Sequence, residues 1–175
     1  MMRKQANGVP DRHRVMGEGG EAFKGRVMNP NVFRVYMLVK MPVLGVTGTW
    51  LKVLDLERCV AVLPYSWRVR NLFGVVTTGA LAAAAEIASV SLWVINIRNQ
   101  GAALTPVPVT VTVEAQQPVT EAVTFRCLDG ERYADVVLEA AGGASVEEAC
   151  QVEGVNVHGQ RVCLVTLWWR LDPKS

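Results

Sequence analysis

The segment from Asn71 to Glu86 holds the residues of this chain whose types and spacing could do chemistry together. It reads NLFGVVTTGALAAAAE, and Glu86 is the only ionisable residue in the apolar run 75–97. A carboxylate among so many apolar side chains is costly to bury as an anion. We therefore expect the pKa of Glu86 to be raised unless a partner stabilises its charge.

An asparagine and several small residues precede this carboxylate, at the point where a helix could begin. They are Asn71, Gly74, Thr78 and Gly79. The first N–H groups of a helix have no intrahelical partner, and the helix dipole favours negative charge there. The segment therefore predicts a site for a developing anion and a candidate base at a fixed spacing.

The surrounding pattern predicts the elements that must position these residues. A helix over Thr78–Ile97 is apolar all round, as a helix buried in a core is. Another helix, Asn31–Met41, follows Asn29-Pro30. We expect strands within 49–64, 107–115 and 121–127, a short helix over Glu131–Ala140, and a hairpin of Cys150–Val157 with Arg161–Leu171. The order predicts an α+β domain in which an antiparallel β-sheet is wrapped around one long central helix, with an added N-terminal helix.

Two targeting alternatives have to be weighed. The run 75–97 is long enough to span a bilayer, but Glu86 near its middle and flanking strand patterns favour a buried core helix and no transmembrane span. Residues 1–28 show no hydrophobic periodicity and predict a flexible leader before a single domain over 29–175. Acidic residues in that leader argue against a mitochondrial transit peptide, so a cytoplasmic location is favoured over a mitochondrial one.

Composition excludes several function classes. A net charge of +2 in 175 residues, without a basic stripe, gives no reason to expect nucleic-acid binding. Four cysteines without metal-ligand spacing indicate reduced, core-filling thiols of an intracellular protein, so we expect no metal site and no cofactor. The sequence has no glycine-rich phosphate loop and no G-x-S-x-G elbow.

With these elements the chain resembles the hotdog-fold acyl-CoA thioesterases, and in particular the branch related to phenylacetyl-CoA thioesterase. That branch's motif runs Asn, two residues, Gly, two residues, His-Gly-Gly, and then Asp or Glu on the central helix. Asn71, Gly74, Gly79 and Glu86 fall on matching positions. Thr77 replaces the histidine of the motif, and Thr78 replaces its first glycine, whose backbone N–H a threonine retains.

The resemblance implies an acyl-CoA or related acyl thioester as substrate and a role in lipid metabolism. The Thr78 and Gly79 amides would bind the oxyanion, and Asn71 would orient water or the carbonyl. Glu86 would act as general base or nucleophile. Gly74 and Thr77 would border the substrate, and arginines could contact coenzyme A phosphates, namely Arg70 and Arg98.

Each of these residues also has a structural interpretation. Glu86 could be a carboxylate hydrogen-bonded to backbone, Arg68 or Arg70, and Asn71 could only shape a turn. The glycines could serve backbone shape alone, and solvated surface arginines are the favoured interpretation of Arg70 and Arg98. A non-catalytic acyl-thioester or lipid-binding protein is therefore the alternative to a hydrolase.

Helix geometry adds an expectation about assembly. Thr78 and Glu86 are eight residues apart, or roughly 12 Å along a helix axis, too far to act on one carbonyl within one chain. Two antiparallel helices across a two-fold axis would bring one chain's Thr78 beside its partner's Glu86. We therefore expect a homodimer, or a tetramer made of two dimers, with shared sites.

Overall fold

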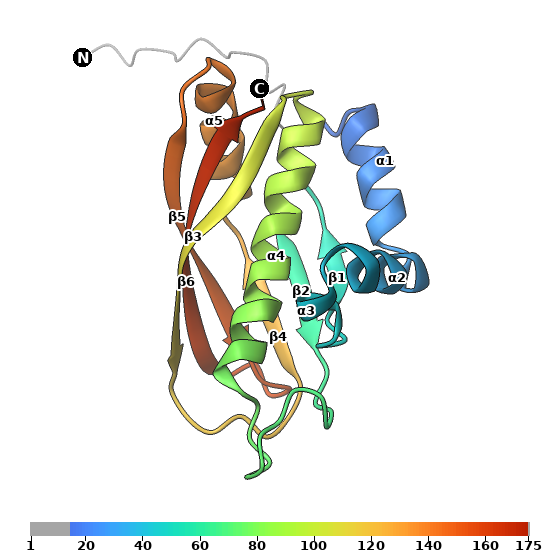
Figure 1. Ribbon diagram of the computed structural model, residues 1–175, viewed down its shortest axis with the longest axis vertical. Helices are drawn as coiled ribbons and strands as arrows, with labels where there is room; N and C mark the ends of the chain where they lie inside the picture. The colour runs from blue at the N-terminus through green and yellow to red at the C-terminus, as the bar shows by residue number, and fades with distance from the viewer. Residues whose placement is uncertain (1–14, 175) are drawn as a thin grey trace, which may run out of the picture.

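The computed structural model describes residues 15–174 of the chain. Its helices are α1 (Glu18–Val27), α2 (Pro30–Lys40), α3 (Pro42–Gly45), α4 (Thr78–Asn99) and α5 (Gly130–Ala141). Its strands are β1 (Trp50–Leu54), β2 (Cys59–Leu63), β3 (Leu104–Ala115), β4 (Val123–Cys127), β5 (Val146–Val155) and β6 (Arg161–Pro173). Figure 1 shows α4 running the length of the molecule, between the sheet and the N-terminal helices.

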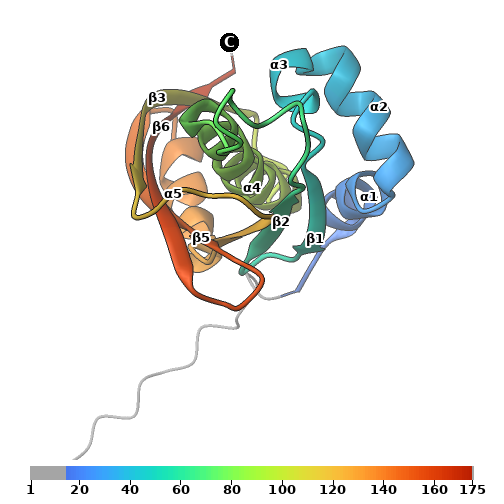
Figure 2. The ribbon, with the colours of Figure 1, turned by 90° about the horizontal axis from the view of Figure 1, so that it is seen from below.

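The strands form one antiparallel sheet in the order β1-β2-β4-β5-β6-β3. Seen along α4, this sheet curls around the helix, while α1, α2 and α3 lie on the other side (Figure 2). The predicted α+β architecture, a sheet wrapped around one long helix with an added N-terminal helix, is confirmed. The strand that follows α4 in the chain, β3, lies at the edge of the sheet and pairs with β6 alone among the described strands.

The central helix α4 begins where the sequence predicted, at Thr78, and extends two residues beyond the predicted end, to Asn99. Thr77 is its N-cap, and the side chain of Thr77 accepts a hydrogen bond from the Ala80 N–H at 3.2 Å. By length and composition α4 could cross a membrane, but 78% of its most apolar stretch is buried inside the protein. It is therefore the core helix of this domain.

The residues of α4 that are not buried recur along a ridge. Apart from Gly79 and Asn99 near the ends, they are Thr78, Ala82, Glu86, Val90, Val94 and Arg98. A spacing of four residues is one of the two ridges by which helices pack against one another. Glu86 thus lies on the part of α4 that the other described residues leave partly uncovered.

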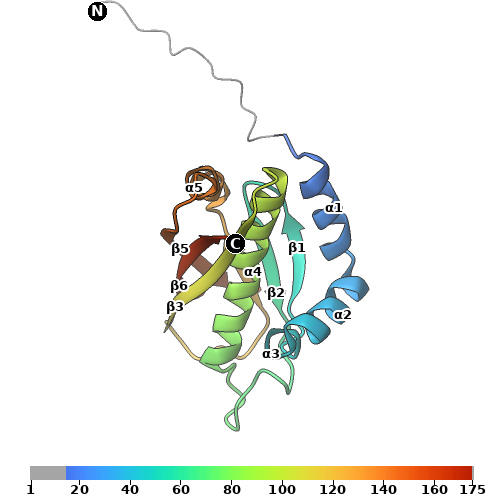
Figure 3. The same cartoon turned by 45° about the horizontal axis from the view of Figure 1, so that its top comes forward.

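Within the expected flexible leader over 1–28, residues 18–27 form the helix α1, which contacts α4 and lies on the same side of the molecule as β1 and α2 in Figure 3. Residues 1–14 of that leader lie outside the described residues. A Cβ added to Gly19 would collide with the backbone oxygen of Arg98, so glycine permits the close approach of the two helices there. The Gly17 N–H donates to Asn99 Oδ1 at 2.7 Å. Gly19 is therefore a packing position between α1 and α4.

The predicted helix after Asn29-Pro30 is confirmed as α2. Asn29 Oδ1 accepts hydrogen bonds from the N–H groups of Asn31 and Val32, and Pro30 occupies the first turn. Phe33 and Met37 bury one face of α2, and the other apolar face remains exposed.

Candidate functional site

The N-terminus of α4 presents unpaired backbone donors. The Thr77 N–H donates to Val69 O at 2.9 Å, and the N–H groups of Ala80 and Leu81 donate to Thr77 O. Among the described residues nothing accepts a hydrogen bond from the N–H of Thr78 or Gly79, and both residues are exposed. These two amides, in the positive field of a 22-residue helix, can bind an anionic oxygen.

The loop before α4 is shaped by Asn71. Asn71 Oδ1 accepts hydrogen bonds from the N–H groups of Phe73 at 2.9 Å and Val75 at 3.1 Å. Gly74 lies at φ +74°, a conformation that glycine tolerates, and Tyr65 Oη donates to its carbonyl oxygen at 2.6 Å. The side-chain oxygen of Asn71 therefore shapes the turn, as the structural interpretation expects. Its Nδ2 group has no acceptor among the described residues.

A surface cavity of about 690 Å³ opens beside this helix end. Three of the predicted site residues line it: Asn71, Thr77 and Thr78. The loop between β3 and β4 forms the other wall, and Val76 N–H donates to Val119 O at 2.8 Å to hold the two loops together. The cavity is large enough for part of a small-molecule ligand.

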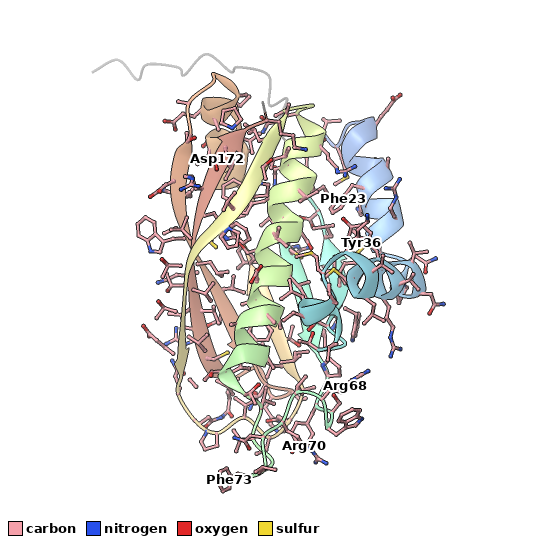
Figure 4. All side chains as sticks on the ribbon, in the orientation of Figure 1. Phe23, Tyr36, Arg68, Arg70, Phe73 and Asp172 are labelled. Atoms are coloured by element: carbon pink, nitrogen blue, oxygen red, sulfur yellow. The ribbon has the colours of Figure 1, made fainter. Side chains whose placement is uncertain are left out.

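Sequence reasoning missed several cavity residues: Phe73, Ala115, Gln116, Gln117, Pro118 and Val119. Phe73 is 88% exposed at the tip of the loop (Figure 4). No motif marks the residues 115–119, because the folded sheet alone brings them beside α4. An exposed aromatic next to a glycine was the one available signal for Phe73.

Glu86 lies in the middle of α4, half-buried and without a hydrogen-bond or ion-pair partner among the described residues. Desolvation by the surrounding apolar side chains raises its pKa above the usual value. The two arginines considered as its partners have other neighbours: Arg68 approaches Gly48, and the Arg70 guanidinium lies 5.8 Å from the Tyr65 ring. A half-buried carboxylate without a partner is suited to accept a proton.

Within one chain Glu86 and the helix end remain separate. Eight residues of helix place Glu86 roughly 12 Å along the axis from Thr78, and Glu86 does not line the cavity. Gly79 lies at the helix end with open space where a Cβ would be. One chain therefore places the exposed amides of the helix end and the Glu86 carboxylate on α4 too far apart to reach one carbonyl.

The two arginines lie at opposite ends of α4. Arg70 is in the loop beside Asn71, where Figure 4 shows it near Arg68 and Phe73. Arg98 is in the last turn of α4, roughly 30 Å along the axis from Thr78, with its guanidinium 5.2 Å from the Phe23 ring. Arg70 is thus placed with the helix end, and Arg98 is not.

Comparisons with solved structures identify this architecture. A protein of unknown function from Pseudomonas aeruginosa, described as a "probable thioesterase", is 18% identical with a TM-score of 0.68, and the match covers 86% of this chain and 100% of that one. A protein of unknown function from Chlorobaculum tepidum is 12% identical with a TM-score of 0.70, covering 85% and 99%. A thioesterase from Haemophilus influenzae is 15% identical with a TM-score of 0.59, covering 79% and 88%.

Comparisons of the sequence give no such match. No model of a known protein family matches the chain, and neither does any curated protein. These three structures are each below 20% identical to the chain, so the likeness concerns the fold. The chain has the hotdog fold, in the form also found in solved structures that are named thioesterases.

Proposed function

We propose that this protein hydrolyses acyl thioesters, with acyl-CoA as the substrate class. The observation that carries the proposal concerns residues 15–174, among which Glu86 has no partner. Glu86 shares a ridge of the core helix with Thr78, and the N–H groups of Thr78 and Gly79 have no acceptor among the same residues. The fold shared with structures named thioesterases supports the reaction class.

In the proposed reaction, Glu86 accepts a proton from a water molecule whose oxygen attacks the thioester carbonyl carbon. The negative charge that develops on the carbonyl oxygen is stabilised by the N–H groups of Thr78 and Gly79. The tetrahedral intermediate then expels the thiolate as the C–S bond breaks. The thiolate takes up the proton held by Glu86, and the acyl group leaves as a carboxylic acid, which loses its remaining proton to solvent.

A second copy of the chain completes the site in this proposal. The unburied ridge of α4 can pack against the same ridge of a partner helix, which would bring Glu86 of one chain beside Thr78 of the other. The edge strand β3 supports such a dimer, because its Val109 and Val111 are 50% and 37% exposed in the single chain. An exposed edge strand of 12 residues is also a template for pairing with another strand.

The cavity at the helix end supports a role for the loop residues in substrate binding. Asn71 Nδ2 would donate to the carbonyl or to the attacking water, and Thr77 and Gly74 would border the acyl group. Arg70 would contact the phosphates of coenzyme A outside the cavity. Arg98 lies at the far end of α4, so only a more extended ligand bound at the same site could contact it. A substrate of this kind belongs inside the cell, which agrees with the four free cysteines.

A thiol-release assay over acyl-CoAs of several chain lengths tests the proposal. We expect turnover by the wild-type protein and its loss in Glu86→Gln, since an amide cannot accept the proton. Glu139→Gln, which changes an exposed glutamate of α5 in the same way, is the matched control and should retain full activity.

One observation favours a second candidate, a non-catalytic protein that binds acyl thioesters. Thr77 replaces a histidine of the resembled motif, and its hydroxyl is engaged as a helix cap. Binding of acyl-CoA by the wild-type protein without any thiol release would establish this candidate and refute hydrolysis.

A further inference from the structure

Two cysteines and an aspartate meet beneath α5, far from the helix end described above. Cys127 ends β4, Asp129 precedes α5, and Cys150 lies in β5. The two sulfur atoms and a carboxylate oxygen all lie within 4.8 Å of one another. Both thiols are buried, whereas Asp129 is partly exposed.

Two hydroxyl groups surround the thiols. Ser89 Oγ, from α4, lies 3.2 Å from Cys150 Sγ and 2.7 Å from Tyr133 Oη. The Cys127 thiol contacts the same Tyr133 hydroxyl at 3.8 Å. The Tyr133 ring is fixed by stacking on Trp93, with centroids 3.5 Å apart. The hydroxyls can donate hydrogen bonds to thiolates, as groups around metal-bound ligands do.

The donor set matches the chemistry of zinc. Thiolate and carboxylate are zinc ligands, and tetrahedral geometry with Zn–S bonds of about 2.3 Å places two sulfurs about 3.8 Å apart. The sulfur atoms of Cys127 and Cys150 lie within 4.8 Å of each other, which is compatible with that sulfur–sulfur distance. Soft thiolates select zinc and similar ions over magnesium or calcium.

The cluster borders a surface cavity at Asp129. A surface cavity of about 340 Å³ is lined by Glu57, Leu128, Asp129, Glu131 and Arg132. Asp129 therefore lies between solvent and the buried thiols. An ion entering past its carboxylate would meet the two sulfurs next, and water from the cavity could take the fourth position.

We propose that Cys127, Asp129 and Cys150 bind one zinc ion or a similar thiophilic divalent ion per chain. Binding releases the two thiol protons to solvent, and no electron is transferred. The ion would join the end of β4, the start of α5 and the middle of β5. It would thereby fix Tyr133 against Trp93 of the core helix. The proposal is independent of the proposed thioesterase activity.

Cobalt titration of the full chain, reduced and freed of metal by a chelator, tests this site. We expect the thiolate-to-cobalt charge-transfer and visible bands of a tetrahedral ion, saturating at one equivalent and lost on addition of zinc. Zinc should also raise the thermal unfolding midpoint. A cobalt spectrum of the wild-type protein without thiolate bands would overturn the proposal. If Cys127 and Cys150 also form a disulfide in air, their proximity would reflect redox pairing instead of metal binding.

Variants assign the ligands. Cys127→Ala and Cys150→Ala should abolish the thiolate bands, while Cys59→Ala, which removes another buried free thiol, should leave them unchanged. Asp129→Asn leaves the buried thiols in place, so it should retain thiolate bands and weaken cobalt binding by at least tenfold. Full cobalt affinity in Asp129→Asn, or unchanged bands in Cys150→Ala, would contradict the assignment.

Discussion

Thr78 and Glu86 lie on one ridge of α4, eight residues apart, with the first at the solvent-exposed helix end and the second half-buried in the middle. Roughly 12 Å of helix axis separates them. In the proposed function each residue has a distinct chemical task, and a second chain is needed to combine the two.

The backbone N–H of Thr78 can be removed selectively. Thr78 is the first residue of α4, where proline is tolerated, and Thr77 already has the extended conformation (φ −71°, ψ 147°) that a residue before proline requires. Thr78→Pro should therefore fold and lower kcat about 100- to 1,000-fold through loss of one oxyanion donor. Thr78→Ala keeps the N–H and should stay within about twofold of wild type. Equal losses in the two variants would assign the effect to the side chain instead.

The activity should depend on the ionisation of Glu86. Desolvation raises its pKa, so the basic form is lost at a higher pH than for an ordinary glutamate. The rate should fall on acidification through that raised pKa. A pH–rate profile measured on enzyme shown to remain folded at each pH checks this, and a flat profile from pH 4 to 8 would indicate a purely structural carboxylate.

Glu86 should also lower the stability of the folded protein at neutral pH. Its pKa is higher in the folded state than in the unfolded state, so the unfolded chain loses this proton first as pH rises. The charged carboxylate then opposes folding above the folded pKa. Glu86→Gln should have an equal or higher thermal midpoint than wild type at pH 7, and the difference should shrink towards pH 4. A lower midpoint at pH 7 would mean that the charge is stabilised by a partner.

Asn71 has separable structural and chemical groups. Asn71→Asp keeps an oxygen that can accept from Phe73 and Val75, whereas Asn71→Ala removes it. If Nδ2 contacts the substrate, both variants should lose activity, on the order of 10- to 100-fold for a misplaced reacting group. Wild-type kcat/KM in Asn71→Asp, with loss only in Asn71→Ala, would limit Asn71 to shaping the loop.

The docking of α1 on α4 can be tested at two glycines. Gly19→Ala places a methyl group against the Arg98 carbonyl and should destabilise the fold by about 1–3 kcal/mol. Gly25→Ala, in the same helix with open space around it, should stabilise it by up to about 1 kcal/mol. Chemical denaturation of both variants measures the difference. Equal free energies of unfolding for the two variants would indicate that α1 does not pack on α4 and is a flexible leader.

The local pattern was enough to predict the core helix. A run of alanines and branched apolar residues preceded by small residues predicted both the start of α4 and its burial, and the structure adds Thr77 as its N-cap. The strands followed from alternation, but the burial of β3 did not: its Val109 and Val111 alternate as a half-buried strand does, yet they are exposed in one chain. The alternation in β3 therefore indicates an apolar surface. We propose that a second copy of the chain covers it.

Contacts between distant parts of the chain could not be predicted. Cys127 and Cys150 are 23 positions apart and match no ligand motif, so they were interpreted as isolated core thiols. They meet because β4 and β5, which come before and after α5 in the chain, pair as antiparallel neighbours in the sheet. The docking of α1 could not be predicted for the same reason, because Gly19 packs against Arg98, which is 79 positions further along the chain.

Mixing two inactive variants tests the shared site most directly. Thr78→Pro and Glu86→Gln are each unfolded, combined in equal amounts and refolded, and thiol release is compared with that of each variant refolded alone. Half of the resulting dimers are mixed, and each mixed dimer has one intact site, so on the order of a quarter of wild-type activity should return. If both residues act within one chain, every site carries a lesion and the mixture should stay as inactive as its components.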